Sequence, residues 1–166
     1  KGECMPRMKE DTIAEFLEEP HVGVLASIQK NGLPYTVPIW WLHDEGVFWL
    51  TGTFNRVWCK HLMERPGCSL CIEALSPVAG HIGIEATAEL FQLPDFDIWP
   101  VSRLLTEKYV GRRNPSNAGA VDSFFTNMKT EPRLLFELTP TNWRAIDMRQ
   151  YRGKKSDRAF QENQQR

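Results

Sequence analysis

The sequence lacks the short motifs that mark the commonest nucleotide, metal and nucleophile sites. It contains no Gly-x-Gly-x-x-Gly, no P-loop and no His-Glu-x-x-His. It also lacks the Gly-x-Ser-x-Gly elbow that carries a nucleophilic serine. Its four histidines lie far apart in the chain, and none is paired at the spacing of metal ligands. The sequence therefore identifies no catalytic residue and no metal site.

Long apolar runs and an excess of one charge are missing as well. No stretch approaches the roughly 20 apolar residues that a helix needs to cross a bilayer, so we expect no membrane partner. The first ten residues are charged and have no apolar segment typical of a secretory signal. The 20 Lys and Arg residues nearly balance 21 Asp and Glu residues, which gives no reason to expect a nucleic-acid partner.

Cysteine is scarce, with four residues: Cys4, Cys59, Cys68 and Cys71. The single Cys-x-x-Cys has no second pair to complete a tetrahedral zinc site. It lies in a strand-like run, where residues three apart point to opposite faces of a sheet. We therefore expect buried free thiols and a reducing, cytoplasmic compartment.

The apolar pattern predicts strands with short helices inserted between them. Helices are expected over residues 11–18, 56–65, 97–110 and 120–129. Strands are expected over residues 21–29, 33–43, 47–51, 68–75, 81–92, 133–138 and 142–148.

The arrangement of these elements predicts a mainly β fold. Asn31-Gly32 is typical of a tight hairpin, and residues 21–51 suggest a β-meander. Because strands do not alternate regularly with crossover helices, we expect a closed or nearly closed antiparallel barrel rather than a doubly wound sheet. We expect one domain over residues 1–148, of which 1–10 form an N-terminal extension, followed by a polar tail over 149–166.

One strand–loop–helix unit stands out as a candidate binding site. The strand around Val37–Trp40 offers an apolar wall, and the loop after Thr51-Gly52 opens a helix. Free backbone N–H groups at that helix start lie beside Arg56 and Lys60, a combination that binds anions. This pattern suits a cofactor with a planar ring at one end and a phosphate at the other. The alternative is an ordinary structural unit, because strand–loop–helix segments with basic residues are common.

Several segments carry a likeness to a known family, in matching order and spacing. They are residues 16–26, 31–40, 46–52, 62–66 and 84–90, with looser matches at 108–111 and 138–143. With these segments, residues 13–92 resemble the pyridoxamine 5'-phosphate oxidase-like, FMN-binding split barrel superfamily. The C-terminal signature of the true pyridoxamine phosphate oxidases is not evident, so vitamin B6 oxidation is not carried over.

The resemblance implies a fold, an activity and a site. The fold is a six-stranded antiparallel split β-barrel of Greek-key type, in a homodimer with FMN at the subunit interface. The activity is that of an FMN-dependent oxidoreductase acting on a small-molecule substrate. The strand lies along the flavin ring, the Thr-Gly pair contacts the flavin, and the helix start holds the phosphate. The implied cofactor-binding residues are Val37, Pro38, Ile39, Trp40, Thr51, Gly52, Arg56, Val57, Trp58 and Lys60.

The sequence departs from the family at the phosphate position. A Ser-Arg-Lys triplet is frequent there, and it falls on Arg56-Val57-Trp58. One lost cation weakens phosphate binding by about 1.5–3 kcal/mol for each charge-assisted hydrogen bond. A deazaflavin coenzyme is therefore an alternative occupant, with an acidic tail near Lys108, Arg112 and Arg113.

Two further alternatives and a candidate substrate side remain open. Haem would need a histidine as axial ligand. A non-enzymatic, cofactor-binding dimer would have Trp58 filling the phosphate position. For each of four further residues, a place in a substrate pocket competes with a place in the core or an interface: Trp41, His43, Tyr109 and Trp143.

Overall fold

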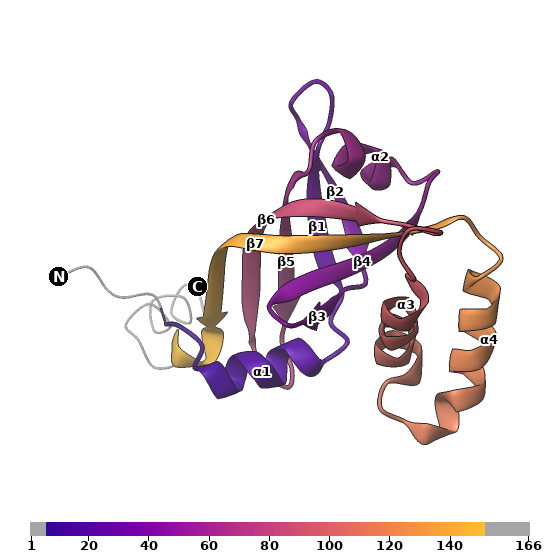
Figure 1. Ribbon diagram of the computed structural model, residues 1–166. Coiled ribbons are helices and arrows are strands. Elements are labelled where there is room, and N and C mark those ends of the chain that lie inside the picture. Colours follow the sequence, from indigo (N-terminus) through magenta and orange to yellow (C-terminus); the bar gives the residue numbers. More distant parts are fainter. Residues whose placement is uncertain (1–5, 152–166) are drawn as a thin grey trace, which may run out of the picture.

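The computed structural model of the protein describes residues 6–151. One curved antiparallel sheet of seven strands dominates it (Figure 1). The strands lie in the order β2-β1-β5-β6-β7-β4-β3, and the sheet does not close on itself. This confirms the predicted mainly β, antiparallel split barrel, with six longer strands and the three-residue β3. The strands are β1 (Gly23–Ile28), β2 (Pro34–Ile39), β3 (Leu42–Asp44), β4 (Val47–Thr53), β5 (Gly67–Ala74), β6 (Gly80–Phe91) and β7 (Arg133–Asp147).

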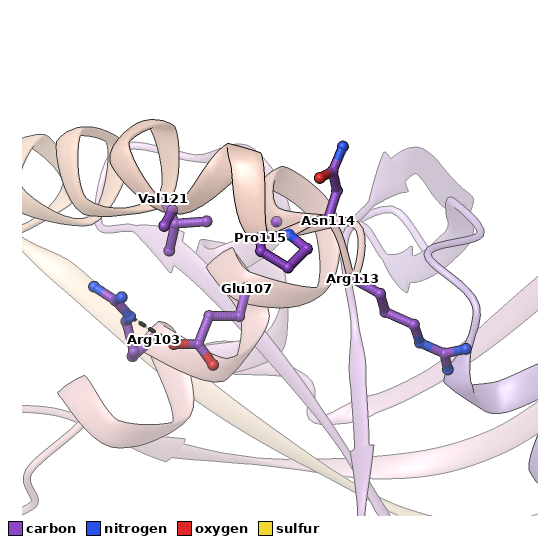
Figure 2. Close-up of a pocket in the computed structure, with 8 residues that line it drawn as sticks. Arg103, Glu107, Arg113, Asn114, Pro115 and Val121 are labelled. Atoms are coloured by element: carbon purple, nitrogen blue, oxygen red, sulfur yellow. Dashed lines mark hydrogen bonds and ion pairs between the residues drawn. The ribbon is translucent and has the colours of Figure 1, made fainter.

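Short helices cover the ends of the sheet (Figure 1). Four are α-helices: α1 (Glu10–Glu18), α2 (Val57–Glu64), α3 (Trp99–Thr106) and α4 (Ala118–Met128). The π-helix η1 (Glu107–Gly111) extends α3, and the 3-10 helix η2 (Pro115–Asn117) leads into α4. These segments surround a hollow near Arg103, Glu107 and Val121 (Figure 2). No helix of the described part is long and apolar enough to span a membrane.

The predicted β-meander is wrong. β1 and β2 form the expected hairpin, with Gly32 in the turn at a φ of +83°. However, β2 then lies at one edge of the sheet, whereas β3 and β4 lie at the other. The strand pairing is interrupted after β2 because Trp41 turns into the core. Its backbone N–H donates to the Tyr109 hydroxyl (3.1 Å) instead of to a neighbouring strand.

The two strands predicted around Pro140 are one continuous strand. β7 pairs with β6 from Leu135 to Asp147, with a register shift between Glu85 and Ala86. Ala86 faces Pro140 and Glu85 faces Asn142, so Thr141 is the extra residue of a bulge. A bulge accommodates a proline that cannot donate to the ladder.

The first described residues lie against the end of this strand. Pro6 accepts a hydrogen bond from Asp147, and the Met8 N–H donates to Ala145. Residues 148–151 form the 3-10 helix η3 (Met148–Tyr151). The rest of the predicted tail, residues 152–166, and the first five residues lie outside the described part of the chain.

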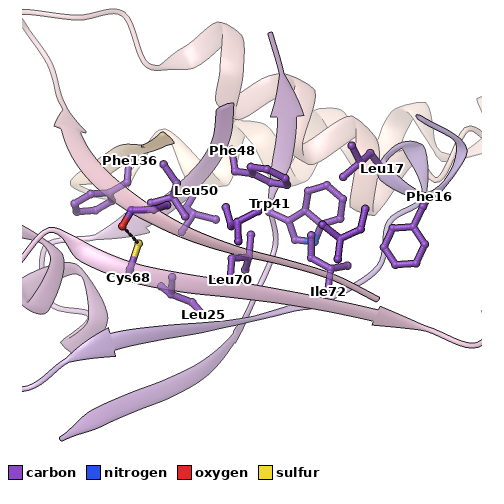
Figure 3. Packing of buried hydrophobic residues seen from close by; sticks show 14 of the residues in the cluster. Phe16, Leu17, Leu25, Trp41, Phe48, Leu50, Cys68, Leu70, Ile72 and Phe136 are labelled. Atoms are coloured by element: carbon purple, nitrogen blue, oxygen red, sulfur yellow. Dashed lines mark hydrogen bonds between the residues drawn. The ribbon is translucent and has the colours of Figure 1, made fainter. Parts of the chain in front are cut away.

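The core fills the inside of the curved sheet (Figure 3). Trp41, Phe48, Leu50 and Phe136 are essentially inaccessible to solvent and pack together with Leu70. They come from different strands and from the break after β2. Alternate strand residues thus supply one continuous apolar cluster, as the period of a half-buried strand requires.

The cysteines only partly match the expectation of buried thiols. Cys59 and Cys68 are buried, whereas Cys71 is exposed. Cys68 and Cys71 do point to opposite faces of β5, as their spacing predicts. Cys4 lies outside the described residues. No group of three potential metal ligands occurs among residues 6–151.

Tyr109→Phe tests the hydrogen bonds that hold the break after β2. The Tyr109 hydroxyl accepts from the Trp41 N–H and donates to the His21 carbonyl (2.8 Å). Removing it leaves a buried donor without a partner, so we expect a loss of about 1–3 kcal/mol in the free energy of unfolding. Urea unfolding measures this loss. Tyr35→Phe is the control: it removes the hydroxyl of another tyrosine, which is half-buried and packs edge-on against His61. Equal midpoints for the two variants would contradict the role of this hydroxyl.

Candidate functional site

Eight of the ten predicted cofactor-binding residues line one pocket of about 210 Å³. They come from β2, from β4 and from the start of α2, which are neighbours in sequence but not in the sheet order. The eight are Val37, Pro38, Ile39, Trp40, Thr51, Gly52, Arg56 and Trp58. Three further residues complete the lining: Phe124 and Met128 of α4, and Arg133 of β7. Sequence reasoning missed these three because they lie more than sixty positions after Trp58, in a region without a recognisable motif.

The apolar end of the pocket is built on the edge strand β2. Pro38 faces Val24 of β1 and has no neighbouring strand on its other side, so its missing N–H costs little. Next to it, the Trp40 ring stacks on Tyr109 with centroids 4.8 Å apart and planes 3° apart. Phe124 lies 5.7 Å from Trp40 on a tilted plane. This end is a rigid aromatic wall suited to a flat ring.

The polar end of the pocket carries two arginines. Arg56 is exposed and is the N-cap residue of α2. Arg133 opens β7 and pairs across the sheet with Thr53 of β4. Between them, the Thr51 hydroxyl donates to the Leu134 carbonyl (3.2 Å), which leaves the lone pairs of its oxygen free. Arg133 is paired with Glu131 through Nη2, but its Nε has no partner within the described residues, so both arginines still have donors for an anion.

Trp58 lies in the core, beneath Gly52. Its side chain is only 4% exposed and its ring contacts Phe136 at a centroid distance of 5.5 Å. A Cβ on Gly52 would lie 2.6 Å from the Trp58 ring and would also meet the Cys59 sulfur. The glycine therefore allows β4 to lie directly on α2, and Trp58 forms the floor of the pocket.

The two remaining predicted residues lie elsewhere. Val57 and Lys60 line a different hollow of about 410 Å³, between α2 and the β1–β2 hairpin. Lys60 shares it with Lys30, His61 and other residues of these elements. Lys60 therefore does not line the pocket that Arg56 lines, although it follows Arg56 by one helical turn.

Comparison with known proteins identifies the family. A model of the pyridoxamine 5'-phosphate oxidase family matches residues 10–147, most of the chain. This protein belongs to the pyridoxamine 5'-phosphate oxidase family. No curated protein matches the sequence significantly.

Three solved structures illustrate what other proteins with this fold bind. An F420 reductase is 18% identical, with 78% of this chain and 93% of that chain covered and a TM-score of 0.58. HutZ, the heme storage protein from Vibrio cholerae, is 16% identical (82% and 94% covered, TM-score 0.62). An FAD-binding protein from Mesorhizobium loti is 16% identical (85% and 96% covered, TM-score 0.54). At these identities the likeness shows the fold, and the same fold carries different cofactors.

The basic residues considered for an acidic cofactor tail are engaged in internal contacts. Lys108 donates to the Leu17 carbonyl (2.8 Å), and its ammonium group lies 3.4 Å from the centre of the Trp41 ring. Arg113 forms ion pairs with Glu18 and Glu19, and Arg112 bonds to the Tyr109 carbonyl. These contacts tie η1 to the end of α1.

The four residues considered for a substrate pocket are not brought together in one cavity. Trp41 is fully buried, and Tyr109 is buried beneath Trp40. His43 lines a hollow with Lys108, and burial lowers the pKa of its imidazole. Trp143 lines another hollow beside the N-terminal segment. In the hollow of Figure 2, Arg103 is paired with Glu107 and Asp122, so it offers no free cation there.

Gly52→Ala tests the contact between the pocket strand and α2. The added methyl group meets Trp58 and Cys59, and overpacking of this kind costs about 1–3 kcal/mol. We expect a lower thermal midpoint. Gly67→Ala is the matched control, because a Cβ there meets no atom within 4 Å. If both variants melt at the same temperature, β4 does not need the glycine.

Lys108→Met tests the burial of this ammonium group. Desolvation lowers the pKa of Lys108 to about 7, from its usual value of 10.5. Between these values the unfolded chain binds a proton that the folded protein has released, so Lys108 makes stability rise with pH in this window. Below it, both states are protonated and the cost of burying the charge is constant.

We expect Lys108→Met to flatten this rise. Urea midpoints from about pH 6.5 to about pH 9.5 measure it. Lys9→Met, which removes an exposed lysine, is the control. A variant that keeps the wild-type slope would show that Lys108 titrates normally.

Proposed function

We propose that this protein is an FMN-binding oxidoreductase that acts on a small-molecule substrate as a homodimer, with the cofactor at the subunit interface. One observation carries the proposal: a single pocket joins the aromatic wall at the end of β2 to a pair of arginines. A flavin mononucleotide has the same two ends, a flat ring and a phosphate. Membership of the pyridoxamine 5'-phosphate oxidase family supports it.

The residues of the pocket fit the two ends of FMN. β2 offers Val37 and Ile39, and the next residue offers the Trp40 ring, as an apolar surface along which a flat ring can lie. Thr51 offers its hydroxyl oxygen, and the arginines offer charged donors at the phosphate end. When bound, the flavin supplies hydride or electron transfer, and the protein supplies position and electrostatics. The chain's own part is to orient the ring, exclude water from one side of it and hold the phosphate.

The size of the pocket favours a second subunit. Its volume of about 210 Å³ lies below the roughly 300–1,000 Å³ of most small-molecule sites. Phe124 of the pocket lining is exposed (39%), as are Phe54 (54%) and Val57 (49%), which flank Arg56 in the chain. A partner subunit packed against them would cover these side chains and enclose the cofactor.

The alternatives receive less support from this pocket. Haem needs an axial ligand, and none of the four histidines lines the pocket in the described part of the chain. A long acidic coenzyme tail would need free cations, but Lys108 and Arg113 are engaged with α1. Trp58 lies under β4 and packs on Phe136, so it forms the floor of the pocket and leaves the polar end to the two arginines.

The visible spectrum of freshly purified protein tests the function directly. We expect flavin absorbance and release of FMN on heating, identified by mass. If the protein is purified without cofactor, it should take up added FMN, and sedimentation should show a dimer. A Soret band would replace the flavin proposal with the haem alternative. Colourless protein that does not bind added FMN would refute the flavin proposal.

Arg56→Ala tests the phosphate end. Loss of one charge-assisted hydrogen bond should weaken FMN binding about tenfold or more, measured by quenching of flavin fluorescence. Lys30→Ala, which removes a charge from the distant hairpin, is the control. Unchanged FMN affinity in Arg56→Ala would remove Arg56 from the site.

A further inference from the structure

The anion end of the pocket lacks the second cation that the family triplet usually supplies. Val57 and Trp58 stand at the remaining triplet positions, and Trp58 is buried in the core. Lys60 lines the hollow beneath the hairpin rather than this pocket. The residues adjacent in sequence therefore provide one cation, the exposed Arg56, for a group with two negative charges.

Arg133 reaches the same end of the pocket from a distant part of the chain. It is the first residue of β7, and its Cα pairs with that of Thr53, three residues before Arg56. The side chain lines the pocket together with Thr51, Gly52 and Arg56. The pairing of β7 with β4 therefore delivers a second guanidinium to the loop where the triplet would act.

The hydrogen bonds of Arg133 are incomplete. Its side chain is only 16% exposed, and one terminal nitrogen, Nη2, bonds to Glu131 at 2.6 Å. Its Nε is buried and has no hydrogen-bond partner within the described residues. A buried donor without an acceptor is unfavourable, and a ligand oxygen that binds there removes the penalty. The ion pair with Glu131 holds one side of the guanidinium and leaves Nε available.

Cys59, beneath the pocket, lies near both arginines. Its thiol lies beneath Gly52, and burial raises its pKa to about 12. The positive charges of Arg56 and of Arg133 both oppose that rise. Two guanidinium groups thus contribute to the potential at one point below the pocket floor.

We infer that Arg133 is the second cation of this site and binds, together with Arg56, the phosphate monoester of the cofactor. The inference rests on the proposed function, since it names the residue that holds one end of FMN. It also makes a chemical distinction: Arg133 recognises the phosphate and contributes little to binding the ring.

The test compares FMN with riboflavin, which has the same ring and no phosphate. Arg133→Gln keeps a polar side chain and removes the charge. In the full-length protein we expect the Kd for FMN to rise by roughly tenfold to a hundredfold, and that for riboflavin by less than about twofold. Quenching of flavin fluorescence measures both. Arg133→Lys should recover part of the FMN affinity, because it restores the charge but not the planar fork.

Two other variants complete the comparison. Lys30→Gln controls for the loss of one positive charge, and we expect wild-type affinity for both flavins. Lys60→Gln tests the competing residue, and we expect no change. The inference is overturned if Lys60→Gln shows the loss that is specific to FMN, if Arg133→Gln has wild-type affinity, or if it weakens FMN and riboflavin equally.

Inorganic phosphate separates this inference from the proposed function. At constant ionic strength it should raise the thermal midpoint of the wild type, and less so that of Arg133→Gln. If the protein binds neither flavin but phosphate stabilises it through Arg133, the flavin proposal fails and the anion site stands. If phosphate has no effect and neither flavin binds, both fail.

Discussion

The hydrogen bond from the Trp41 backbone N–H to the Tyr109 hydroxyl is the contact on which the architecture depends. It gives the backbone N–H just after β2 a partner, so the chain can leave that strand without pairing with the next strand. The indole N–H of Trp41 and the Tyr109 hydroxyl both donate to the His21 carbonyl. As a result β2 lies at one edge of the sheet and β3 at the other, and the barrel remains open.

The same contact shapes the candidate site. Trp41 turns into the core, and its neighbour Trp40 turns to the pocket, where it stacks on the Tyr109 ring. Tyr109 thus bonds to one tryptophan with its hydroxyl and supports the other with its ring. The π-helix η1 that carries Tyr109 is in turn held to α1 by Lys108. The aromatic wall of the pocket is therefore anchored on the far side of the core.

The polar end of the pocket is assembled differently. Arg56 comes from the loop before α2, whereas Arg133 arrives with β7. The structural neighbours include an F420 reductase, a heme storage protein and an FAD-binding protein, so the fold alone does not select an occupant. In this chain one pocket is lined by an aromatic wall, two arginines and a buried tryptophan beneath them.

Local patterns in the sequence determined most of the elements and the sequence-adjacent half of the site. Alternating apolar residues predicted the strands, and Asn31-Gly32 predicted the hairpin, because both signals act over a few neighbouring residues. The segment from Val37 to Trp58 could be singled out for the same reason. Only the tertiary structure decided that β2 and β3 lie at opposite edges, that Lys60 faces another hollow and that Arg133 and Phe124 join the pocket. These outcomes depend on which strands pair and on where Trp41 and Trp58 are buried, and such long-range packing leaves no signature in the local sequence.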